Sequence, residues 1–326
     1  MPSHSQSSGP SRTSHAASDP LAAVISLLRP RAVAPKIISG AGAWSVRYAA
    51  HDEPGFCIML EGTCILDVDG VGEVQLDAGD FVLLPATPGF TMSSARGLKP
   101  TLITAADGNE LRHGTPAGRP AMRQLGGSFS VDRANARLLG RFLPALILVR
   151  HNDPAATRLA RLVELIGEEA TTRPRRVGRE LILERLVEVL LIEALRVRPA
   201  EAGTQEKGLL AGLADPDLAR ALRRMHADVA HRWTVAELGR VAGMSRAVFA
   251  ERFTRTVGMS PMAYLLEWRI AVAKDVLLRE QAPLADVAEM IGYQSASAFS
   301  VAFSRHAGCS PSAFARAMHE ERRATR

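Results

Sequence analysis

The carboxyl-terminal third of the sequence contains an internal repeat, and this repeat limits the fold more than any other feature. Residues 236–261 and 285–311 carry the same residue types at matching positions: Leu238 with Val287, Gly243 with Gly292, Phe253 with Phe303, and Gly258-Met-Ser-Pro with Gly308-Cys-Ser-Pro. The offset is 49 residues before the second helix of each copy and 50 after it. A repeat of this kind predicts two copies of one supersecondary unit.

Each copy has the pattern of a short helix, a glycine turn and a second helix. Ser245 and Ser295 stand at the start of the second helix, where a serine side chain can cap the free backbone N–H groups. Apolar residues then recur every four positions on one face, as Phe249, Phe253 and Val257 in the first copy and Phe299, Phe303 and Ala307 in the second. The pattern predicts two helix-turn-helix units, each with a buried face.

The opposite faces of these two second helices are the candidate DNA-binding surfaces. They carry Ser245, Arg246, Ala247, Ala250, Glu251, Thr254 and Arg255 in the first copy, and Ser295, Ala296, Ser297, Ser300, Val301, Ser304 and Arg305 in the second. Residues 262–279 between the copies have no interior Gly or Pro and predict a helix about 27 Å long. Such a spacer could place two recognition helices in successive major grooves, which lie about 34 Å apart on one face of the duplex.

The charge of the chain agrees with a nucleic-acid partner. The net charge is +6, and 36 of the 40 basic residues are arginine because lysine occurs only at 36, 99, 207 and 274. Residues 215–326 contain 16 Lys plus Arg against 12 Asp plus Glu. Arginine presents a planar fork to phosphate or guanine, so we expect double-stranded promoter DNA as the partner of this region.

Short apolar runs separated by Gly, Asp and Pro occupy residues 44–104. The runs are 44–48, 56–60, 64–68, 73–76, 81–84 and 101–104, a spacing that predicts an all-β sandwich or barrel. Glu61-Gly62 and Asp69-Gly70 stand between runs, where they predict tight hairpin turns. The whole chain is therefore expected to be of the α+β class.

Helical periodicity follows the predicted strands. Apolar stripes at Leu159, Leu162, Val163 and Ile166, and at Leu183, Leu186, Val187, Leu190, Leu191 and Leu195, predict two amphipathic helices. One stripe could face the β region and the other could pair two subunits. We predict a disordered tail at 1–18, a β sensor domain at 19–130, a helical connector that dimerises at 131–198, a linker at 199–214 and a DNA-binding domain at 215–326.

These residues resemble a known family. The last 110 or so residues resemble the DNA-binding domain of AraC/XylS-type regulators, above all in Gly243-Met-Ser-Arg246, Gly258-Met-Ser-Pro261, Tyr264–Arg269, Ile291-Gly-Tyr-Gln-Ser295 and Phe299–Phe303. The β region, through Asp19-Pro-Leu21, Gly79-Asp-Phe81 and Leu84-Pro85, resembles the cupin-like sensor domain of one branch of that family. The resemblance implies a homodimeric transcription regulator that is controlled by a small-molecule effector. Contact with RNA polymerase, as an activator makes, is a further expectation.

The sequence departs from the family pattern at two positions. A basic residue commonly stands at the position of Val301, and a basic or amide residue often stands at that of Glu251. Glutamate can accept a hydrogen bond from cytosine N4, and valine can contact a thymine methyl group. Glu251 could equally be a solvated residue or the partner of Arg255 four positions later, so the two recognition helices do not predict the operator sequence.

The β region offers an incomplete set of metal ligands. His51, Glu53 and Glu61 lie in the first cupin motif region, but residues 79–91 contain no histidine. We therefore expect a metal-free ligand pocket and no cofactor. The alternative from another class is a metal-dependent cupin enzyme with an accessory DNA-binding tail. Because no catalytic triad or phosphate-binding glycine loop is present, we expect the chain not to be an enzyme.

Cys57 and Cys64 flank the Glu61-Gly62 turn. If that turn is a two-residue hairpin, Met59 pairs with Cys64, and Cys57 lies diagonally from Cys64 on the same face. The pair could then act as a redox switch. Two small apolar side chains in a barrel core are the favoured alternative, because no Lys or Arg adjoins them in sequence.

Location and specificity complete the sequence-based expectations. Three cysteines do not form a secreted disulfide framework, and neither an amino-terminal signal segment nor 18 uninterrupted apolar residues occur. We expect a cytoplasmic protein without a membrane partner. The alanines at 247, 250, 296 and 298 leave open an architectural protein that binds DNA without sequence preference.

Overall fold

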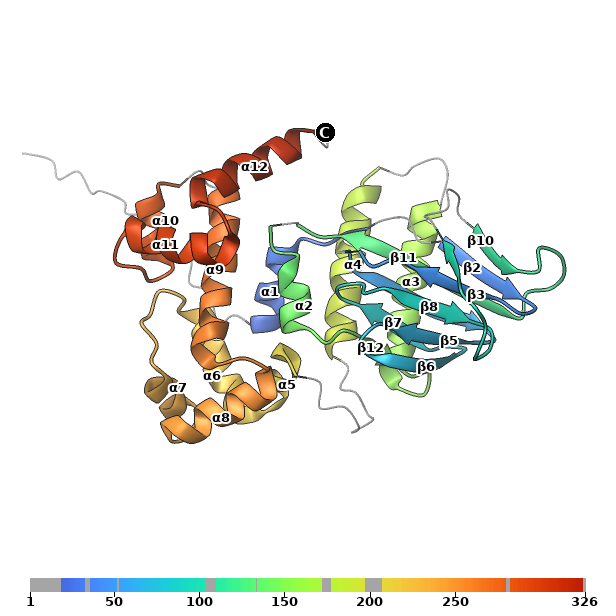
Figure 1. Ribbon diagram of the computed structural model, residues 1–326, viewed down its shortest axis with the longest axis horizontal. Helices are drawn as coiled ribbons and strands as arrows, with labels where there is room; N and C mark the ends of the chain where they lie inside the picture. The colour runs from blue at the N-terminus through green and yellow to red at the C-terminus, as the bar shows by residue number, and fades with distance from the viewer. Residues whose placement is uncertain are drawn as a thin grey trace, which may run out of the picture.

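The computed structural model describes residues 19–32, 36–51, 53–103, 110–132, 134–171, 177–196, 207–279 and 282–324. The described residues between 19 and 196 form two β-sheets and four helices, here called the β domain, and those between 207 and 324 form the helical domain (Figure 1). The α+β prediction is confirmed. The predicted tail at 1–18 and residues 199–206 of the predicted linker lie outside the described residues.

Two sheets form the centre of the β domain. The larger has the strand order β10-β2-β11-β4-β7-β12, with β1 beside β11, and the smaller has the order β6-β5-β8-β3-β9. The strands of the larger sheet are β1 (Arg31–Ala32), β2 (Lys36–Ala41), β4 (Gly55–Glu61), β7 (Phe81–Leu84), β10 (Glu110–Gly114), β11 (Met122–Ser130) and β12 (Ile147–Val149). Those of the smaller are β3 (Ser45–Tyr48), β5 (Thr63–Val68), β6 (Gly72–Asp77), β8 (Phe90–Ser93) and β9 (Thr101–Ile103). Residues from both sheets, including Trp44, Met59, Cys64 and Met92, share one apolar cluster.

The hairpin predicted at Glu61-Gly62 is wrong. β4 and β5 belong to different sheets, so Met59 pairs with Gln124 on β11 and Cys64 pairs with Leu76 on β6. Gly62 has a φ of +73°, and a Cβ there would lie 2.0 Å from the carbonyl oxygen of Ala121. The chain therefore passes from one sheet to the other at a corner that only glycine fits.

The second predicted turn, at Asp69-Gly70, joins two strands that do pair. Val68 on β5 lies opposite Gly72 on β6, and the N–H of Val71 donates to the carbonyl oxygen of Val68 at 3.0 Å. Gly70 has a φ of +77°, which is the left-handed conformation that such a turn requires. The hairpin prediction is confirmed at this position.

Four helices belong to the β domain: α1 (Pro20–Leu28), α2 (Arg137–Phe142), α3 (Pro154–Thr171) and α4 (Arg179–Arg196). The predicted stripes on α3 and α4 both enter one apolar cluster with Phe56, Phe81 and Phe129 of the larger sheet. Neither stripe is left over to pair subunits. The segment predicted as wholly helical also contains β12, which pairs with β7.

Asp80, the central residue of the Gly79-Asp-Phe81 motif, has a structural role as a hydrogen-bond acceptor. Its carboxylate is fully buried and accepts hydrogen bonds from the backbone N–H of Asp77 at 3.1 Å, the backbone N–H of His151 at 2.8 Å and Arg150 Nη1 at 3.0 Å. Burial acts to raise the pKa of Asp80, but these donors together with the His151 ring hold it below its usual value. The carboxylate thus ties the β6–β7 turn to the segment before α3.

The helical domain consists of α5 (Leu209–Ala214), α6 (Pro216–Ala227), α7 (Val235–Val241), α8 (Arg246–Val257), α9 (Pro261–Arg279), α10 (Leu284–Met290), α11 (Ala296–Ala307) and α12 (Pro311–Ala324). The α5 helix occupies the end of the segment predicted as a linker. The long helix predicted between the repeats is α9, and the units α7–α8 and α10–α11 lie toward its opposite ends (Figure 1). Between these two ends, one side of α9 faces α1 and α2 of the β domain.

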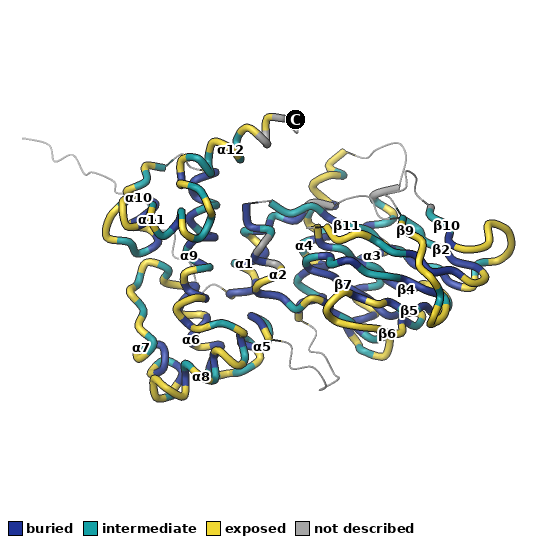
Figure 2. The backbone as a smooth tube through the Cα atoms, in the orientation of Figure 1, coloured by how far each residue is buried: buried dark blue, intermediate teal, exposed yellow. Residues whose placement is uncertain are grey.

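The two units differ in how they are connected to the rest of the chain. Phe249 and Phe253 of α8 belong to the same apolar cluster as α1, α2 and α4. Phe299 and Phe303 of α11 belong to a separate cluster with one end of α9. Figure 2 shows that the strands of both sheets are buried over much of their length, whereas α7 and α8 carry long exposed stretches. Within the described residues, no helix is long and apolar enough to span a bilayer.

Candidate DNA-binding surface

The first unit, α7–α8, is closed by a glycine turn and a serine cap. Gly243 has a φ of +73°, the left-handed conformation that glycine adopts without steric cost. The Ser245 side chain accepts a hydrogen bond from the N–H of Val248 at 3.4 Å and so caps α8. Phe249 and Phe253 are fully buried, which fixes the face of α8 that points to solvent.

The second unit, α10–α11, repeats this geometry. Gly292 has a φ of +83°, and a Cβ there would lie 2.2 Å from the carbonyl oxygen of Ala230. The Ser295 side chain accepts from the N–H of Ala298 at 3.1 Å and caps α11. Phe299 and Phe303 are fully buried. Both helix-turn-helix units that the repeat predicted are therefore present.

Most of the predicted contact residues lie on the solvent side of their helices. The exposed ones are Ser245, Arg246, Ala247, Glu251, Thr254 and Arg255 on the first unit, and Ser295, Ser297, Val301 and Arg305 on the second; Ala250, Ala296, Ser300 and Ser304 are partly covered. The hydroxyl groups of Thr254 and Ser300 each donate to the carbonyl oxygen four residues earlier, at 2.7 Å. A serine or threonine bonded in this way already uses its donor within its own helix.

The exposed arginines differ in their partners. Arg255 Nη1 lies 3.3 Å from Glu251 Oε1, so the ion pair considered from the sequence does form. Arg252, which is not among the predicted contacts, is held by Asp215 of the α6 cap at 2.6 Å. Among the described residues, Arg246 and Arg305 form no ion pair and no side-chain hydrogen bond. Of the four arginines on α8 and α11, these two guanidinium groups are the most readily available to a phosphate.

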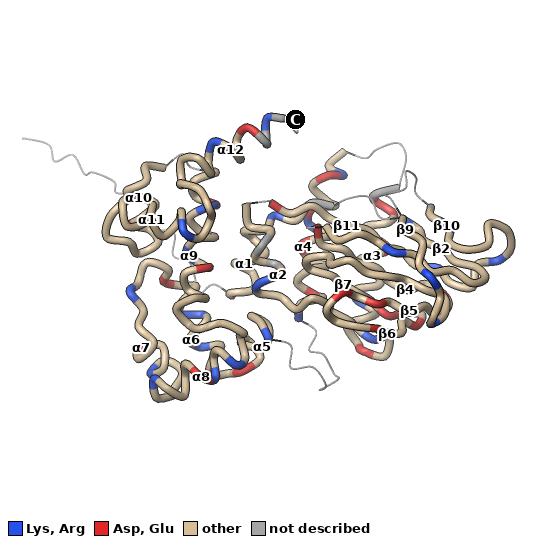
Figure 3. Tube along the Cα trace, viewed as in Figure 1, with Lys and Arg blue, Asp and Glu red and all other residues tan. Residues whose placement is uncertain are grey.

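The two recognition helices also differ in charge. Lys and Arg positions run along α6, α7 and α8 in Figure 3. The α8 helix contains three arginines and one glutamate, whereas Arg305 is the single arginine of α11 and Val301 stands at the centre of its exposed face. The first unit is therefore better suited to phosphate contact, and the second to apolar contact with base edges.

Comparison with known proteins agrees with this geometry. Residues 19–198 match the family model described as cupin, and residues 238–317 match the one described as helix-turn-helix domain. An AraC-like transcription regulator of Streptomyces lividans is 38% identical over 299 residues, which cover 90% of this chain and 96% of that protein. The chain is a member of the AraC-like transcription regulators. A relative from Streptomyces antibioticus with the same description is 37% identical over 298 residues, which cover 90% of this chain and 97% of that protein.

Solved structures show weaker likeness to this AraC-family chain. The DNA-binding domain of AdpA, solved in complex with a target DNA, is 28% identical and matches with a TM-score of 0.31. The match covers 32% of this chain and 94% of that domain.

The cupin domain of this AraC-family chain contains two polar contacts that the sequence did not indicate. The hydroxyl of Tyr48 lies 3.0 Å from His113 Nε2, and burial lowers the pKa of His113. Gln124 is also buried; its Nε2 lies 3.5 Å from Met92 Sδ, and its Oε1 has no hydrogen-bond partner among the described residues. These residues come from β3, β10 and β11, whose adjacency depends on the sheet topology, so no local motif marks them.

The metal candidates of this AraC-family chain are not gathered into a site. His51, Glu53 and Glu61 are all exposed. Glu61 pairs with Arg123 at 3.2 Å, and Glu53 accepts from the Ser128 hydroxyl at 3.4 Å. Within the part of the chain that is described, no group of three or more His, Cys, Asp or Glu side chains is placed to hold a metal ion.

Cys57 and Cys64 lie on different sheets, yet both contribute to the apolar cluster between the sheets. Cys64 Sγ is 3.8 Å from Met59 Sδ, and Cys57 and Cys64 are not joined by a disulfide. Burial raises the pKa of both thiols, that of Cys64 to about 12. Since the thiolate is the reactive form, this environment favours a structural role for both residues.

Proposed function

We propose that this chain binds specific promoter sites through α8 and α11, and that a signal received by the cupin domain controls this binding. The observation that carries the proposal is the pair of capped units at opposite ends of α9, each presenting an exposed arginine, Arg246 or Arg305, without an ion-pair partner among the described residues. Phosphate contacts by these arginines would fix the register of the protein on the duplex. The base sequence would be read by other exposed side chains of α8 and α11.

The two helices would read DNA differently. On α8, Glu251 can accept from cytosine N4, and the ion pair with Arg255 would hold its carboxylate in place. On α11, Val301 can contact a thymine methyl group, with Ser297 beside it on the exposed face. An architectural protein without sequence preference remains the alternative, and the experiment described below separates the two.

The signal is most simply a small molecule taken up between the sheets. Gln124 would offer a buried acceptor to a hydroxyl or amine of such a molecule, and the Tyr48–His113 pair would offer a second polar contact. A redox signal through Cys57 and Cys64 stays a prediction, which the raised thiol pKa values make the weaker of the two. We infer no catalytic role for the cupin domain.

The regulator would act as a homodimer in the cytoplasm and would contact RNA polymerase at the promoters that it activates. Because the inward stripes of α3 and α4 are occupied, a dimer contact through these helices would use outward residues. Leu165 on α3 and Leu181, Ile182 and Val189 on α4 are large apolar side chains that remain exposed. Exposed apolar groups of this size are common at subunit contacts.

Genome-wide occupancy of the tagged full-length chain tests the proposal. The wild type is compared with the double variant Arg246→Ala/Arg305→Ala and with a control that loses the same charge from the β domain, Lys99→Ala/Arg119→Ala; both control residues are exposed. Discrete promoter peaks in the wild type and control that vanish in the first variant would support it. Uniform coverage in the wild type would favour the architectural alternative, and no enrichment in any of the three would refute DNA binding.

A further inference from the structure

One face of α9 is built to receive the β domain. Glu267, Ala271 and Asp275 are spaced four residues apart and therefore lie along a single stripe of this helix. We call these three residues the docking stripe. The stripe is polar at both ends, although most of the other inward residues of α9 are apolar and buried.

Each member of the docking stripe contacts a different side chain of the β domain. The Arg141 guanidinium of α2 pairs with Glu267, Asn135 Nδ2 donates to the carbonyl oxygen of Ala271 at 3.3 Å, and Arg29 Nη2 lies 2.6 Å from Asp275 Oδ1. These contacts join segments that are more than one hundred residues apart in sequence. The β domain therefore contacts α9 through polar groups at three points along about two turns of helix.

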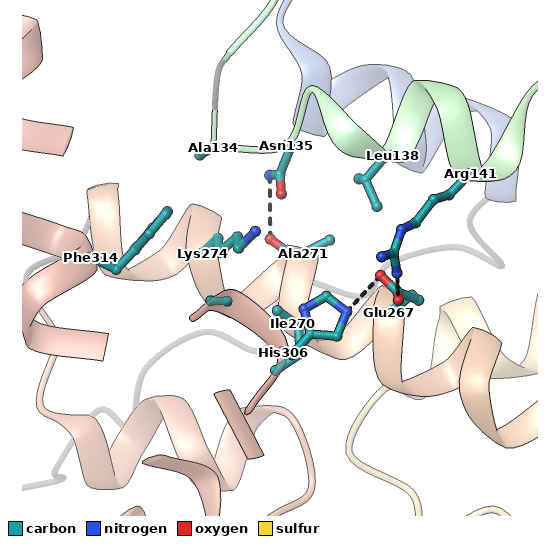
Figure 4. A pocket seen from close by; sticks show the side chains of 11 residues that line it. Ala134, Asn135, Leu138, Arg141, Glu267, Ile270, Ala271, Lys274, His306 and Phe314 are labelled. Carbon is teal, nitrogen blue, oxygen red and sulfur yellow. Dashed lines mark hydrogen bonds and ion pairs between the residues drawn. The ribbon is translucent and has the colours of Figure 1, made fainter. Parts of the chain in front are cut away.

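Asp275 also pairs with Arg279 of α9 itself, at 3.2 Å, whereas the second partner of Glu267 lies on another helix. Glu267 Oε1 contacts Arg141, whereas its Oε2 lies 2.7 Å from His306 Nε2 on α11 (Figure 4). Only 12% of the Glu267 side chain is exposed, so solvent screens these contacts weakly. One carboxylate thus lies between a side chain of the β domain and a side chain of the second recognition helix.

The position of His306 makes this contact relevant to the DNA-facing surface. His306 directly follows Arg305, the exposed arginine of α11, in the last turn of the helix. A shift of His306 relative to α9 would therefore move Arg305 as well. Among the described residues, no ion pair of this kind joins α8 to the β domain. The core of α8 is instead continuous with that of the β domain, whereas the core of α11 is separate.

The surroundings of Glu267 leave room for such a shift. A cavity of about 200 Å³ opens beside it, lined by Leu138 of α2, Lys274 of α9 and Phe314 of α12 among others. Figure 4 shows the side chains of α2, α9 and α11 converging on this space. Close packing therefore does not fix α11 against the β domain on this side.

We propose that Glu267 is a positioning residue, which holds the second recognition helix through His306 and is itself held by Arg141, so that docking of the β domain sets the position of α11. The inference rests on the proposed function and deepens it. A signal that broke the Arg141–Glu267 pair would act on the second helix-turn-helix unit, while the apolar cluster that α8 shares with α2 would keep the first in place. Coupling of this kind requires an element that both partners bias, and Glu267 on α9 is that element.

Hydrogen exchange in the full-length chain without DNA gives the first test. Arg141→Met removes the β-domain partner of Glu267. Arg29→Met is the matched control, because it removes the other arginine that contacts the docking stripe and leaves Glu267 with both its partners. We expect exchange in α11 to accelerate several-fold in Arg141→Met and to remain near the wild-type rate in Arg29→Met, with α8 unchanged in both. Equal rates in α11 for the wild type and Arg141→Met would overturn the proposal whether or not the chain binds DNA.

Hydroxyl-radical footprinting gives the second test, with a duplex that carries the site of highest genomic occupancy. We expect Arg141→Met and His306→Ala each to weaken protection of the half-site bound by α11 by roughly five-fold, the low end of measured couplings, and to spare the half-site bound by α8. In the double variant Arg141→Met/His306→Ala, protection of that half-site should be little weaker than in either single variant, because both substitutions act through Glu267. Equal weakening of both half-sites by Arg141→Met and Arg29→Met would show that Arg141 only docks the domain, and would overturn the proposal. Absence of any footprint in the wild type would instead refute the proposed function.

Discussion

Arg29 and Asp275 join the two domains across 246 residues of sequence, with Arg29 Nη2 2.6 Å from Asp275 Oδ1. Among the described residues, Arg29 is also the one non-glycine residue with a positive φ, 44°. It ends α1 in the left-handed conformation, a position where glycine is usual. An unfavourable backbone conformation persists only where the surrounding contacts hold it. We infer that the long-range contact with Asp275 helps to hold Arg29 in this conformation.

The backbone strain at Arg29 can be separated from its ion pair by two substitutions. Both Arg29→Gly and Arg29→Ala remove the pair with Asp275, but only glycine relieves the left-handed conformation. We therefore expect Arg29→Gly to exceed Arg29→Ala in free energy of unfolding by about 1 kcal/mol. Urea denaturation of both full-length variants measures the difference, and equal midpoints would show that the position carries no strain.

Local sequence patterns predicted the two helix-turn-helix units, because the turn glycine, the capping serine and the buried phenylalanines of each unit lie within about 25 residues of one another. Gly243 and Ser245 act on their own turn and helix, and the phenylalanines that follow repeat every four residues. The helix α9 was equally visible as a run without Gly or Pro. Sequence therefore located the whole candidate DNA-binding face, including Arg246 and Arg305.

The remainder depended on contacts that no local pattern encodes. Glu61-Gly62 has the composition of a hairpin turn, but the carbonyl of Ala121 determines that it is a corner between sheets. The strand at Ile147–Val149 is too short to show periodicity between helical segments. The docking stripe was hidden because its partners Arg29, Asn135 and Arg141 lie in another domain.

His226 predicts a loss of stability in acid. It is buried, with Nε2 2.7 Å from the Tyr264 hydroxyl, and burial lowers its pKa to about 3. The unfolded chain takes up this proton near pH 6.5, so the stability due to the neutral ring is complete above that pH and declines below it. Between pH 6.5 and pH 5 the decline should be about 2 kcal/mol.

The variant His226→Gln measures that contribution, and His51→Gln, at an exposed position, is its control. The free energy of unfolding of the wild type should fall more steeply from pH 7.5 to pH 5 than that of His226→Gln. The control should follow the wild type. Parallel curves for all three proteins would mean that the folded state accepts a proton on His226.

The raised pKa values of the Cys57 and Cys64 thiols predict that both react slowly with thiol reagents in the folded chain. With a pKa of about 12, Cys64 has on the order of one thiolate in ten thousand at pH 8, and Cys57 has fewer. Cys57 and Cys309 are both half-buried, but Cys57 packs with Cys64 in the apolar cluster between the sheets. We therefore expect Ellman's reagent to modify Cys309 first, and Cys57 and Cys64 only on unfolding. Mass spectrometry of the labelled peptides identifies the sites. A Cys57–Cys64 disulfide formed by mild peroxide in the folded chain would contradict this expectation and restore the redox switch.

Arg246 and Arg305, which pair with no carboxylate in the described part of the chain, predict the salt dependence of DNA binding. Each phosphate contact releases condensed counterions, so losing one should reduce the slope of log K against log salt by about one unit. We expect that reduction from Arg246→Ala and from Arg305→Ala. Arg255→Ala should have a smaller effect, because Glu251 already engages that guanidinium at 3.3 Å. Fluorescence anisotropy over a salt series, with the duplex of highest occupancy and Arg119→Ala as control, measures the slopes of the wild type and the four variants. A full unit lost in Arg255→Ala would show that DNA displaces Glu251 from this pair.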